Sequence, residues 1–541
     1  MPGHGIQDIE IIFLLLLLFV VVFGLLARKL AIAYPIVLVI AGLLLSFFPR
    51  IPKVGLNPDL VFFVILPPLL YSAAWLTSWR EFTFNLVSIV FLAFGLVTFT
   101  IVGVTEAGQW LLPGFDWRVG LVLGAIVAPT DAIAATSIAR RLGLPRRLVD
   151  VLEGESLLND ASALLALEFG IGLLVAGHAP TFGEGALRLF YLTAAGIAVG
   201  LAVGEIVHLV EDRIDDGPIE IALSILTPYV AYLAANFMRA SGVLAVVACG
   251  LYLSRKSSHF FSPTVRLQAW AVWESLTFIL NGLVFVLIGL QLPYVIGAIR
   301  DHNLSTLILY GLAFSGLLIL LRLMWVFPGA LIANVVRRRV FHQDVTLPPT
   351  RHIFILGWTG MRGVVSLAAA IALPQVLANG EPFAQRNMII FLAFSVILVT
   401  LVLQGLTLPP LIRVLGASRG PFKARSEEEE KEARRTIVRA ALDYLEESKA
   451  KKDGQADAEV YKDLAHHYRQ RLATLTEGDD SEAEGADPTF YRRFNELSRQ
   501  LLRVERQTAV QLRNQRRISD ELLRQIEREL DLGEARFIAK S

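Results

Sequence analysis

Two clusters of acidic and hydroxyl residues lie inside apolar sequence between residues 121 and 168. In the first cluster, Pro129 is followed directly by Thr130 and Asp131. The second cluster stands among leucines and alanines and consists of Glu155, Ser156, Asn159 and Asp160. A charged side chain at the centre of a membrane helix costs about 2.5–3.5 kcal/mol on insertion scales, so buried acids of this kind indicate a functional site. Carboxylates and hydroxyls beside a helix-breaking proline predict a site for a small cation.

The second cluster is expected to occupy one side of a helix. Glu155 and Asn159 are four residues apart, as are Ser156 and Asp160, so their side chains point the same way. Because Asn159 is neutral, Asp160 offers one titratable charge for which a cation and a proton would compete. Such competition predicts one-for-one exchange with no net movement of charge. The predicted ion- and proton-binding residues are Asp160, Asp131, Thr130, Ser156 and Asn159, with Na⁺ itself at Asp160, Ser156 and Thr130.

Two apolar segments are predicted to be interrupted helices. Pro129 has no N–H and clashes with the carbonyl four residues earlier, so the helix begun near Arg118 must kink or open. The simpler alternative is a proline kink in which Thr130 bonds back to its own helix. In the other half, three glycines fall within residues 357–363, and each weakens a helix by about 1 kcal/mol relative to alanine. Paired interruptions of this kind indicate the midplane site of a transporter with inverted repeats.

The buried carboxylate of Glu155 requires a positively charged partner, because it would otherwise be protonated. Arg362 lies in the second interruption, and we predict that the two form a structural ion pair. Other polar residues in apolar segments are Arg322, Glu274 and Asn281. For these, a packed polar network and direct contact with the ion are both open.

Composition separates the chain of 541 residues into two regions, 1–416 and 417–541. The first is almost continuously apolar and the second is charge-rich, which indicates a membrane protein with a soluble tail. The net charge of +1 and the lack of a basic cluster argue against nucleic-acid binding. No nucleotide or other cofactor motif is visible, and the single Cys249 cannot form an intrachain disulfide.

The apolar region contains about thirteen segments of roughly spanning length. They lie near 8–27, 32–48, 58–77, 84–112, 119–139, 148–176, 185–210, 219–238, 241–254, 267–293, 303–334, 353–379 and 387–415. Lys and Arg are concentrated in the odd-numbered connections, which are therefore expected to be cytoplasmic. We predict a multi-pass protein of the bacterial plasma membrane, with the N-terminus outside and the C-terminal tail in the cytoplasm.

Three classes of function compete for these features. An ion channel would need a continuous pore with repeated filter segments, and no such repeat is present. An intramembrane hydrolase could use Asp131 and Asp160, but the sequence context of the aspartyl membrane proteases is absent. A secondary cation/proton antiporter accounts for the paired breaks and the buried acids, and it is not an enzyme. K⁺ in place of Na⁺ is the alternative within this class.

Three segments carry a family resemblance. They are PTDAIAATSIARRLGLPRRLVDVLEGESLLNDASALL, WTGMRGVVSLAAAIALP and FILNGLVFVLIGLQLP. Together they resemble the cation–proton antiporters of the NhaP/NHE class, and the resemblance covers essentially all of 1–416. It implies an all-α fold, a homodimer and electroneutral exchange of Na⁺, Li⁺ or sometimes K⁺ for H⁺. It further implies a core, including 84–176 and 303–415, that moves against a dimerisation part, including 8–77 and 185–293.

The resemblance also assigns roles to residues. Asp160 is similar to the essential ion and proton carboxylate, beside Asn159 and Ser156, and Thr130 and Asp131 resemble the contributors from an unwound helix. Glu155 and Arg362 resemble the stabilising pair. Family members often carry an acid after the LPPLL of the third span, where this chain has Ser72 and Ala73, which leaves the cation preference open.

The tail, 417–541, is expected to be helical and cytoplasmic. Two charged, helix-prone stretches, 427–451 and 491–535, account for most of its length. It would either assist contacts in the dimer or act as a pH- or partner-sensing domain, with His466 and His467 as titratable groups.

Overall fold

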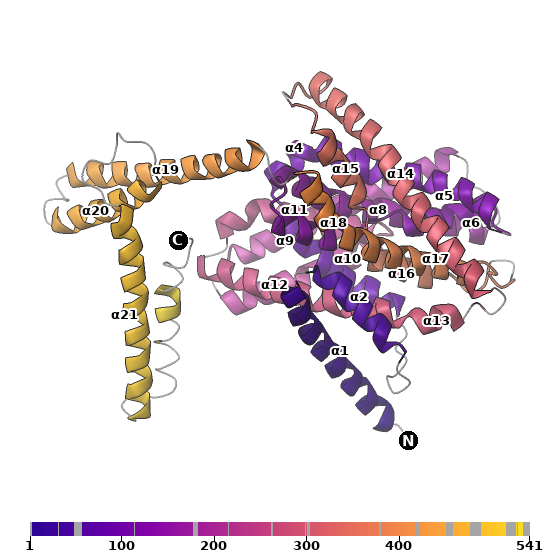
Figure 1. Cartoon of the computed structure of the whole chain (residues 1–541), viewed down its shortest axis with the longest axis horizontal. Coiled ribbons are helices and arrows are strands. Elements are labelled where there is room, and N and C mark those ends of the chain that lie inside the picture. The colour runs from indigo at the N-terminus through magenta and orange to yellow at the C-terminus, as the bar shows by residue number, and fades with distance from the viewer. Residues whose placement is uncertain are drawn as a thin grey trace. The chain divides into compact units, whose positions relative to one another are not determined.

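The chain forms two compact units, residues 1–419 and 420–541. The computed structural model describes residues 3–30, 32–47, 57–112, 114–176, 182–214, 216–260, 263–297, 299, 303–343, 345–377, 380–417, 421–450, 458–475, 488–515, 526 and 529–533. Within these residues the regular elements are helices (Figure 1). The predicted all-α class is therefore confirmed.

The first unit contains the helices on which the apolar segments lie. In chain order they are α1 (Gly3–Leu30), α2 (Tyr34–Leu45), η1 (Leu60–Ile65), α3 (Leu66–Leu76), α4 (Trp79–Val90), η2 (Phe91–Leu96), α5 (Val97–Leu111), α6 (Trp117–Val127), α7 (Ala132–Arg141), α8 (Arg146–Ala176), α9 (Phe182–Glu211), α10 (Gly217–Phe237), α11 (Gly242–Phe260), α12 (Pro263–Leu290), α13 (Leu292–Gly297), α14 (Leu304–Arg339), α15 (Thr350–Trp358), α16 (Val364–Ile371), α17 (Arg386–Val399), η3 (Thr400–Gln404) and α18 (Gly405–Val414). The elements η1, η2 and η3 are π-helical turns within longer helices.

Helices long and apolar enough to cross a membrane number nine in the described part of the chain. Two shorter apolar helices, Tyr34–Leu45 and Leu60–Leu76, coincide with further predicted segments. The segments predicted at 241–254 and 353–379 correspond to α11 and to α15 with α16. The polytopic architecture is thus confirmed, whereas a total of about thirteen crossings stays a prediction.

Both predicted interruptions are present. α6 ends at Val127, two residues before Pro129, and α7 begins at Ala132, so residues 128–131 are not helical. The Asp131 side chain caps α7, because its Oδ1 accepts a hydrogen bond of 2.8 Å from the Ile133 N–H. In the second half, α15 ends at Trp358 and α16 begins at Val364. The chain opens at both places, which excludes the simple proline kink.

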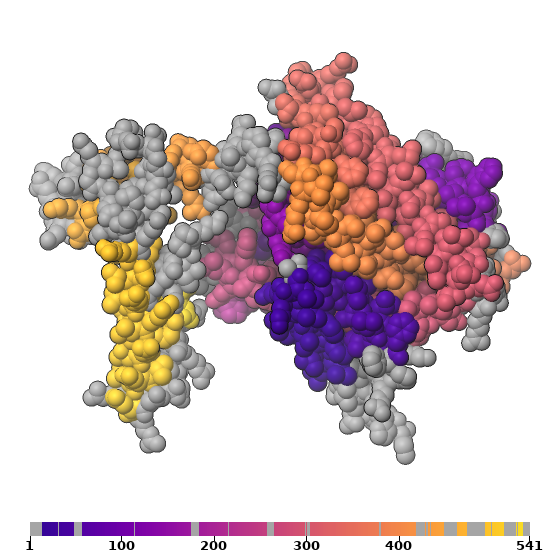
Figure 2. All heavy atoms as spheres, in the orientation of Figure 1, coloured from indigo at the N-terminus to yellow at the C-terminus, as the bar shows by residue number. Residues whose placement is uncertain are grey.

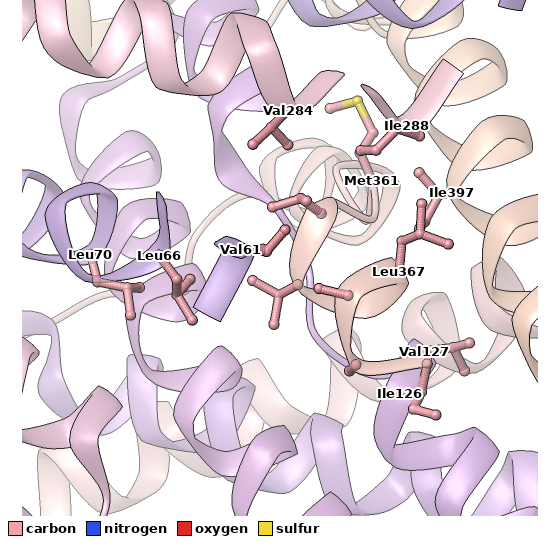
Figure 3. Close-up of a cluster of buried hydrophobic side chains, with 14 of the residues drawn as sticks. Val61, Leu66, Leu70, Ile126, Val127, Val284, Ile288, Met361, Leu367 and Ile397 are labelled. Carbon is pink, nitrogen blue, oxygen red and sulfur yellow. The ribbon is translucent and has the colours of Figure 1, made fainter. Parts of the chain in front are cut away.

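Apolar side chains from distant parts of the sequence pack around these interruptions. Figure 3 shows Val61, Leu66 and Leu70 of η1 and α3 facing residues of α6, α12, α16 and α17. Met361, from the second interruption itself, is buried in the same cluster. Unwound backbone at membrane depth is tolerated where protein covers it or where it lines a cavity, and this packing supplies the cover.

The second unit contains α19 (Pro421–Ala450), α20 (Ala458–Leu475) and α21 (Pro488–Asn514). Its described core is small: Val438, Leu442 and Ala465 are buried, with Tyr468 and Leu472 packed against them. The rings of His467 and Phe494 are in edge contact, with their centroids 4.8 Å apart. The tail is therefore helical, as predicted, and its role stays a prediction.

Candidate ion-binding site

The two interruptions lie against each other and are joined by hydrogen bonds. The Asp131 N–H donates to the Met361 carbonyl oxygen at 2.8 Å, which links one open segment directly to the other. The Arg362 guanidinium donates to the Ala128 carbonyl oxygen at 2.6 Å. Opening a helix leaves carbonyls without their usual donors, and buried polar groups of this kind require partners. Each interruption therefore satisfies backbone groups of the other.

Glycine at position 363 allows this close approach. A Cβ atom on Gly363 would lie 2.6 Å from both Cβ and Oδ2 of Asp131, closer than real Cβ contacts. Since Asp131 is held as the cap of α7, it cannot move away without disturbing that helix.

Gly363→Ala is therefore expected to separate the two interruptions and to abolish most transport while the protein still inserts. Gly172→Ala is the matched control, because a Cβ at Gly172 of α8 meets nothing within 4 Å. Exchange by both variants in reconstituted vesicles, normalised to the amount of folded protein, provides the measurement. Wild-type exchange by Gly363→Ala would show that the contact is not needed.

Thr130 is held between two side chains of α8. Its hydroxyl donates to Glu155 Oε1 at 3.0 Å and accepts from Asn159 Nδ2 at 2.6 Å. Ser156 directly follows Glu155 on α8, and its Oγ accepts from the Ala132 N–H at 3.3 Å. The polar face predicted on α8 thus packs on the first interruption and fixes its backbone.

The predicted pairing of Glu155 with Arg362 is corrected by the structure. Glu155 pairs with Arg322 of α14, whose two terminal nitrogens lie 2.5 and 2.9 Å from the two carboxylate oxygens. Both side chains are 1% exposed. Arg322 also donates to the Leu356 carbonyl oxygen at 3.3 and 3.1 Å, so its guanidinium is anchored on α15. A bidentate pair with further hydrogen bonds is the geometry that a buried charge requires.

Arg362 instead forms hydrogen bonds at the open backbone segments. Its guanidinium reaches Ala128, and its own N–H donates to Thr400 Oγ1 at 3.2 Å. Thr400 is the first residue of the π-helical turn η3, and turns of this type are frequent at functional sites. The orphaned carbonyl of Ala128 explains why Arg362 does not pair with Glu155.

A cavity of about 210 Å³ lies beside the interruptions. Four of the predicted ion-binding residues line it: Thr130, Asp131, Ser156 and Asp160. No hydrogen bond or ion pair engages the Asp160 carboxylate among the residues that the structure describes. Asp160 is therefore a carboxylate held in a cavity, next to a second carboxylate, with its oxygens available to a ligand.

The remaining predicted residues take different places. Asn159 is buried outside the cavity lining. It donates to Thr130 and has an amide oxygen without a hydrogen-bond partner.

The residues that follow LPPLL in the third predicted span differ in their places. Ala73 lines the cavity, as does Asn281 of α12, whereas Ser72 is buried and donates to the Leu69 carbonyl oxygen. Ser72 therefore does not replace a missing acid there. Glu274 lies outside this cavity.

Sequence reasoning missed two hydroxyl residues of the site, Ser366 and Thr400. Ser366 lines the cavity, and its buried hydroxyl has no hydrogen-bond partner. Both are single hydroxyls in long apolar runs, and their proximity to the second interruption was the only available signal.

The ion pair Arg140–Glu153, with nitrogen and oxygen 2.5 Å apart, also lines the cavity. The Arg140 side chain is 67% exposed, so this part of the cavity wall reaches the surface of the unit. The connection between α7 and α8, flanked by Arg141, Arg146 and Arg147, is predicted to face the cytoplasm. The cavity thus runs from Asp160 toward one face of the unit.

Residues 14–414 match the family model described as the transmembrane sodium/hydrogen exchanger. The chain belongs to the sodium/hydrogen exchanger family. This family consists of multi-pass membrane transporters, so the exchanger is not an enzyme and the hydrolase alternative falls away.

Relatives of the exchanger cover much of its length. It is 36% identical over 532 residues to an uncharacterized Na(+)/H(+) exchanger of Mycobacterium tuberculosis (strain ATCC 25618 / H37Rv), covering 96% of this chain and 94% of the relative. It is 33% identical to a sodium, potassium, lithium and rubidium/H(+) antiporter of Bacillus pumilus, covering 82% and 66%. It is 32% identical to an Na(+)/H(+) antiporter of Aphanothece halophytica, covering 76% and 75%.

The fold of the exchanger is similar to a solved structure. The sodium proton antiporter MjNhaP1 from Methanocaldococcus jannaschii matches with a TM-score of 0.59 and 20% identity, over 76% of this chain and 100% of that chain. The predicted NhaP/NHE resemblance is confirmed by this match together with the family model.

Proposed function

We propose that this exchanger carries Na⁺ or Li⁺ in one direction and H⁺ in the other, one for one, with cation and proton competing for Asp160. The observation that carries the proposal is the carboxylate of Asp160, which faces the cavity without a hydrogen-bond partner in the described structure. Hard monovalent cations prefer oxygen ligands, and Thr130, Ser156 and Asp131 supply oxygens around the same cavity.

The charges of the site support a stoichiometry of one. Two guanidinium groups, Arg322 and Arg362, are buried here with the carboxylate of Glu155, and the carboxylates of Asp131 and Asp160 line the cavity beside them. With every group ionised, the site has one negative charge more than positive charge. One proton or one monovalent cation would neutralise it, and burying an uncompensated charge in apolar surroundings is strongly unfavourable.

This charge argument also supports alternating access. The site with Asp160 occupied can move between the two sides of the membrane, whereas the site with a bare carboxylate is held back by its charge. Movement restricted to the two occupied forms couples the flow of H⁺ to the flow of the cation. The H⁺ gradient would thereby drive Na⁺ out of the cytoplasm.

K⁺ is the second candidate substrate. The Bacillus pumilus relative is named for sodium, potassium, lithium and rubidium, while the Aphanothece halophytica relative is named for Na⁺ alone. Ala73 lines the cavity, and its side chain supplies no oxygen. The cavity therefore offers the cation fewer oxygen ligands than it would with an acid at position 73. With fewer ligands, the site is expected to select less strictly by ion size.

The proposed setting is the bacterial plasma membrane. The distribution of Lys and Arg supports an external N-terminus and a cytoplasmic tail. The resemblance of the sequence to the NhaP/NHE class supports a homodimer, in which the part including 8–77 and 185–293 would form the contact.

Exchange in proteoliposomes tests the proposal. Addition of Na⁺ or Li⁺ is expected to collapse an imposed pH gradient, and K⁺ addition measures the alternative. An imposed membrane potential is expected to leave the rate unchanged, because no net charge moves. A rate that follows the potential would contradict the one-for-one assignment, and cation flux without proton movement would contradict antiport altogether.

A further inference from the structure

A second and larger cavity lies in the first unit, apart from the ion cavity. Its volume is about 880 Å³, and its walls come from α1, α2, α7, α12 and α18. Figure 2 shows the indigo surface of α1 and α2 near the orange surface of the segment that contains α18. The proposed transport cycle uses none of the residues around this cavity.

Three arginines from three different helices line the cavity: Arg28, Arg141 and Arg413. In the described structure no carboxylate lies within ion-pair distance of any of them. Among the described residues that line the cavity, Glu274 is the only acid. The described wall of the cavity therefore has more positive than negative charge, and this predicts an anionic ligand rather than a cation.

The rest of the wall is apolar. Leu30, Ile138, Phe278 and Leu406 are among the lining residues. On α1 next to the cavity, Leu25 is 61% exposed, so apolar surface is present outside the cavity on this helix as well. A ligand suited to this wall has an anionic group for the arginines and an apolar part for the leucines and the phenylalanine.

We propose that this cavity binds the phosphate headgroup of an anionic phospholipid, with an acyl chain against its apolar wall. Guanidinium groups bind phosphate through charge-assisted, often bidentate hydrogen bonds. Basic pockets between membrane helices on the cytoplasmic side are suited to such headgroups. All three arginines lie in or beside connections that the charge pattern assigns to the cytoplasmic face.

The site is placed to influence transport. α7 forms part of both cavities: Ser137 and Ile138 line the basic one, and Ile133 and Thr136 line the ion cavity. Arg28 belongs to the predicted dimerisation part, whereas Arg141 and Arg413 belong to the predicted core. A phosphate bound to all three would bridge the two parts and stabilise their present arrangement.

The test measures lipid binding to the detergent-solubilised full chain, with no need for transport. The probes are phosphatidylglycerol, phosphatidylcholine and inorganic phosphate, and the readout is the rise in unfolding temperature as each is titrated. Phosphatidylglycerol is expected to stabilise the protein at lower concentration than phosphatidylcholine. Equal stabilisation by the two lipids would overturn the proposal, and so would saturable stabilisation by inorganic phosphate alone.

The test is made more specific by variants that are expected to weaken lipid binding and one that is expected to strengthen it. Arg28→Gln and Arg413→Gln should each weaken the apparent affinity for phosphatidylglycerol about fivefold. Glu274→Gln should strengthen it, because it removes the negative charge of the one acid in the described wall, and a misfolded variant could not bind more tightly. Lys29→Gln, next to Arg28 but outside the cavity lining, is the control and should change nothing. An unchanged affinity in Glu274→Gln, or an equal loss in Lys29→Gln, would refute this site.

Discussion

Replacing Asp160 with asparagine is expected to reduce cation-driven proton exchange to the level of protein-free vesicles. The amide has nearly the shape of the carboxylate but can neither release a proton nor neutralise a cation. Because Asp160 has no hydrogen-bond partner in the described structure, its replacement breaks no described contact and the fold should persist. The measurement is the change in internal pH on addition of Na⁺, Li⁺ or K⁺.

Asp150→Asn provides the matched control for this prediction. Asp150 lies on the same helix, α8, but does not line the ion cavity. It should therefore retain exchange close to that of the wild type. If Asp160→Asn exchanged cations for protons at the wild-type rate, the carrier group would have to be another residue, and Asp131 would be the first to examine.

Removing one member of the Glu155–Arg322 pair is expected to cause the largest loss of stability. Both side chains are buried, so Arg322→Met would leave an uncompensated carboxylate and lower the free energy of unfolding by about 3–5 kcal/mol. The double variant Glu155→Leu with Arg322→Met should recover much of this loss, because an apolar pair can replace a buried ion pair. Thermal unfolding in detergent gives the comparison.

Two further variants show whether the effect belongs to this pair. Glu155→Leu with Arg362→Met should not recover stability, because Arg362 bonds to Ala128 and Thr400 rather than to Glu155. Arg188→Gln breaks the exposed pair with Glu168, whose side chains are 61% and 48% exposed, and should cost less than about 1 kcal/mol. If Glu155→Leu with Arg362→Met did recover stability, Glu155 would pair with Arg362, as the sequence predicts.

The sequence was sufficient to predict four of the polar residues that line the ion cavity, Thr130, Asp131, Ser156 and Asp160. Ser156 and Asp160 are one helical turn apart, and Pro129 forces an opening next to Thr130 and Asp131, so local geometry brings these groups together. The structure shows all four around one cavity. Local rules worked here because few residues separate the members of each group.

The partner of Glu155 depended on packing that no local rule reveals. Arg322 and Arg362 are both arginines in apolar sequence, and either side chain could reach a buried carboxylate. Arg322 bonds to the Leu356 carbonyl where α14 and α15 pack together, which places it at Glu155. Arg362 instead donates to the Ala128 carbonyl, which lies in the first interruption. Thr400 likewise enters the site only because η3 packs beside the second interruption.

The bond from the Asp131 N–H to the Met361 carbonyl oxygen involves main-chain atoms alone. Almost any pair of residues could provide it, and a proline at position 131 is the one common substitution that removes the donor. The crossing of the two open segments can therefore persist through extensive evolutionary drift. Side chains around it can then vary, which gives one backbone frame the capacity to serve transporters that differ in ionic preference.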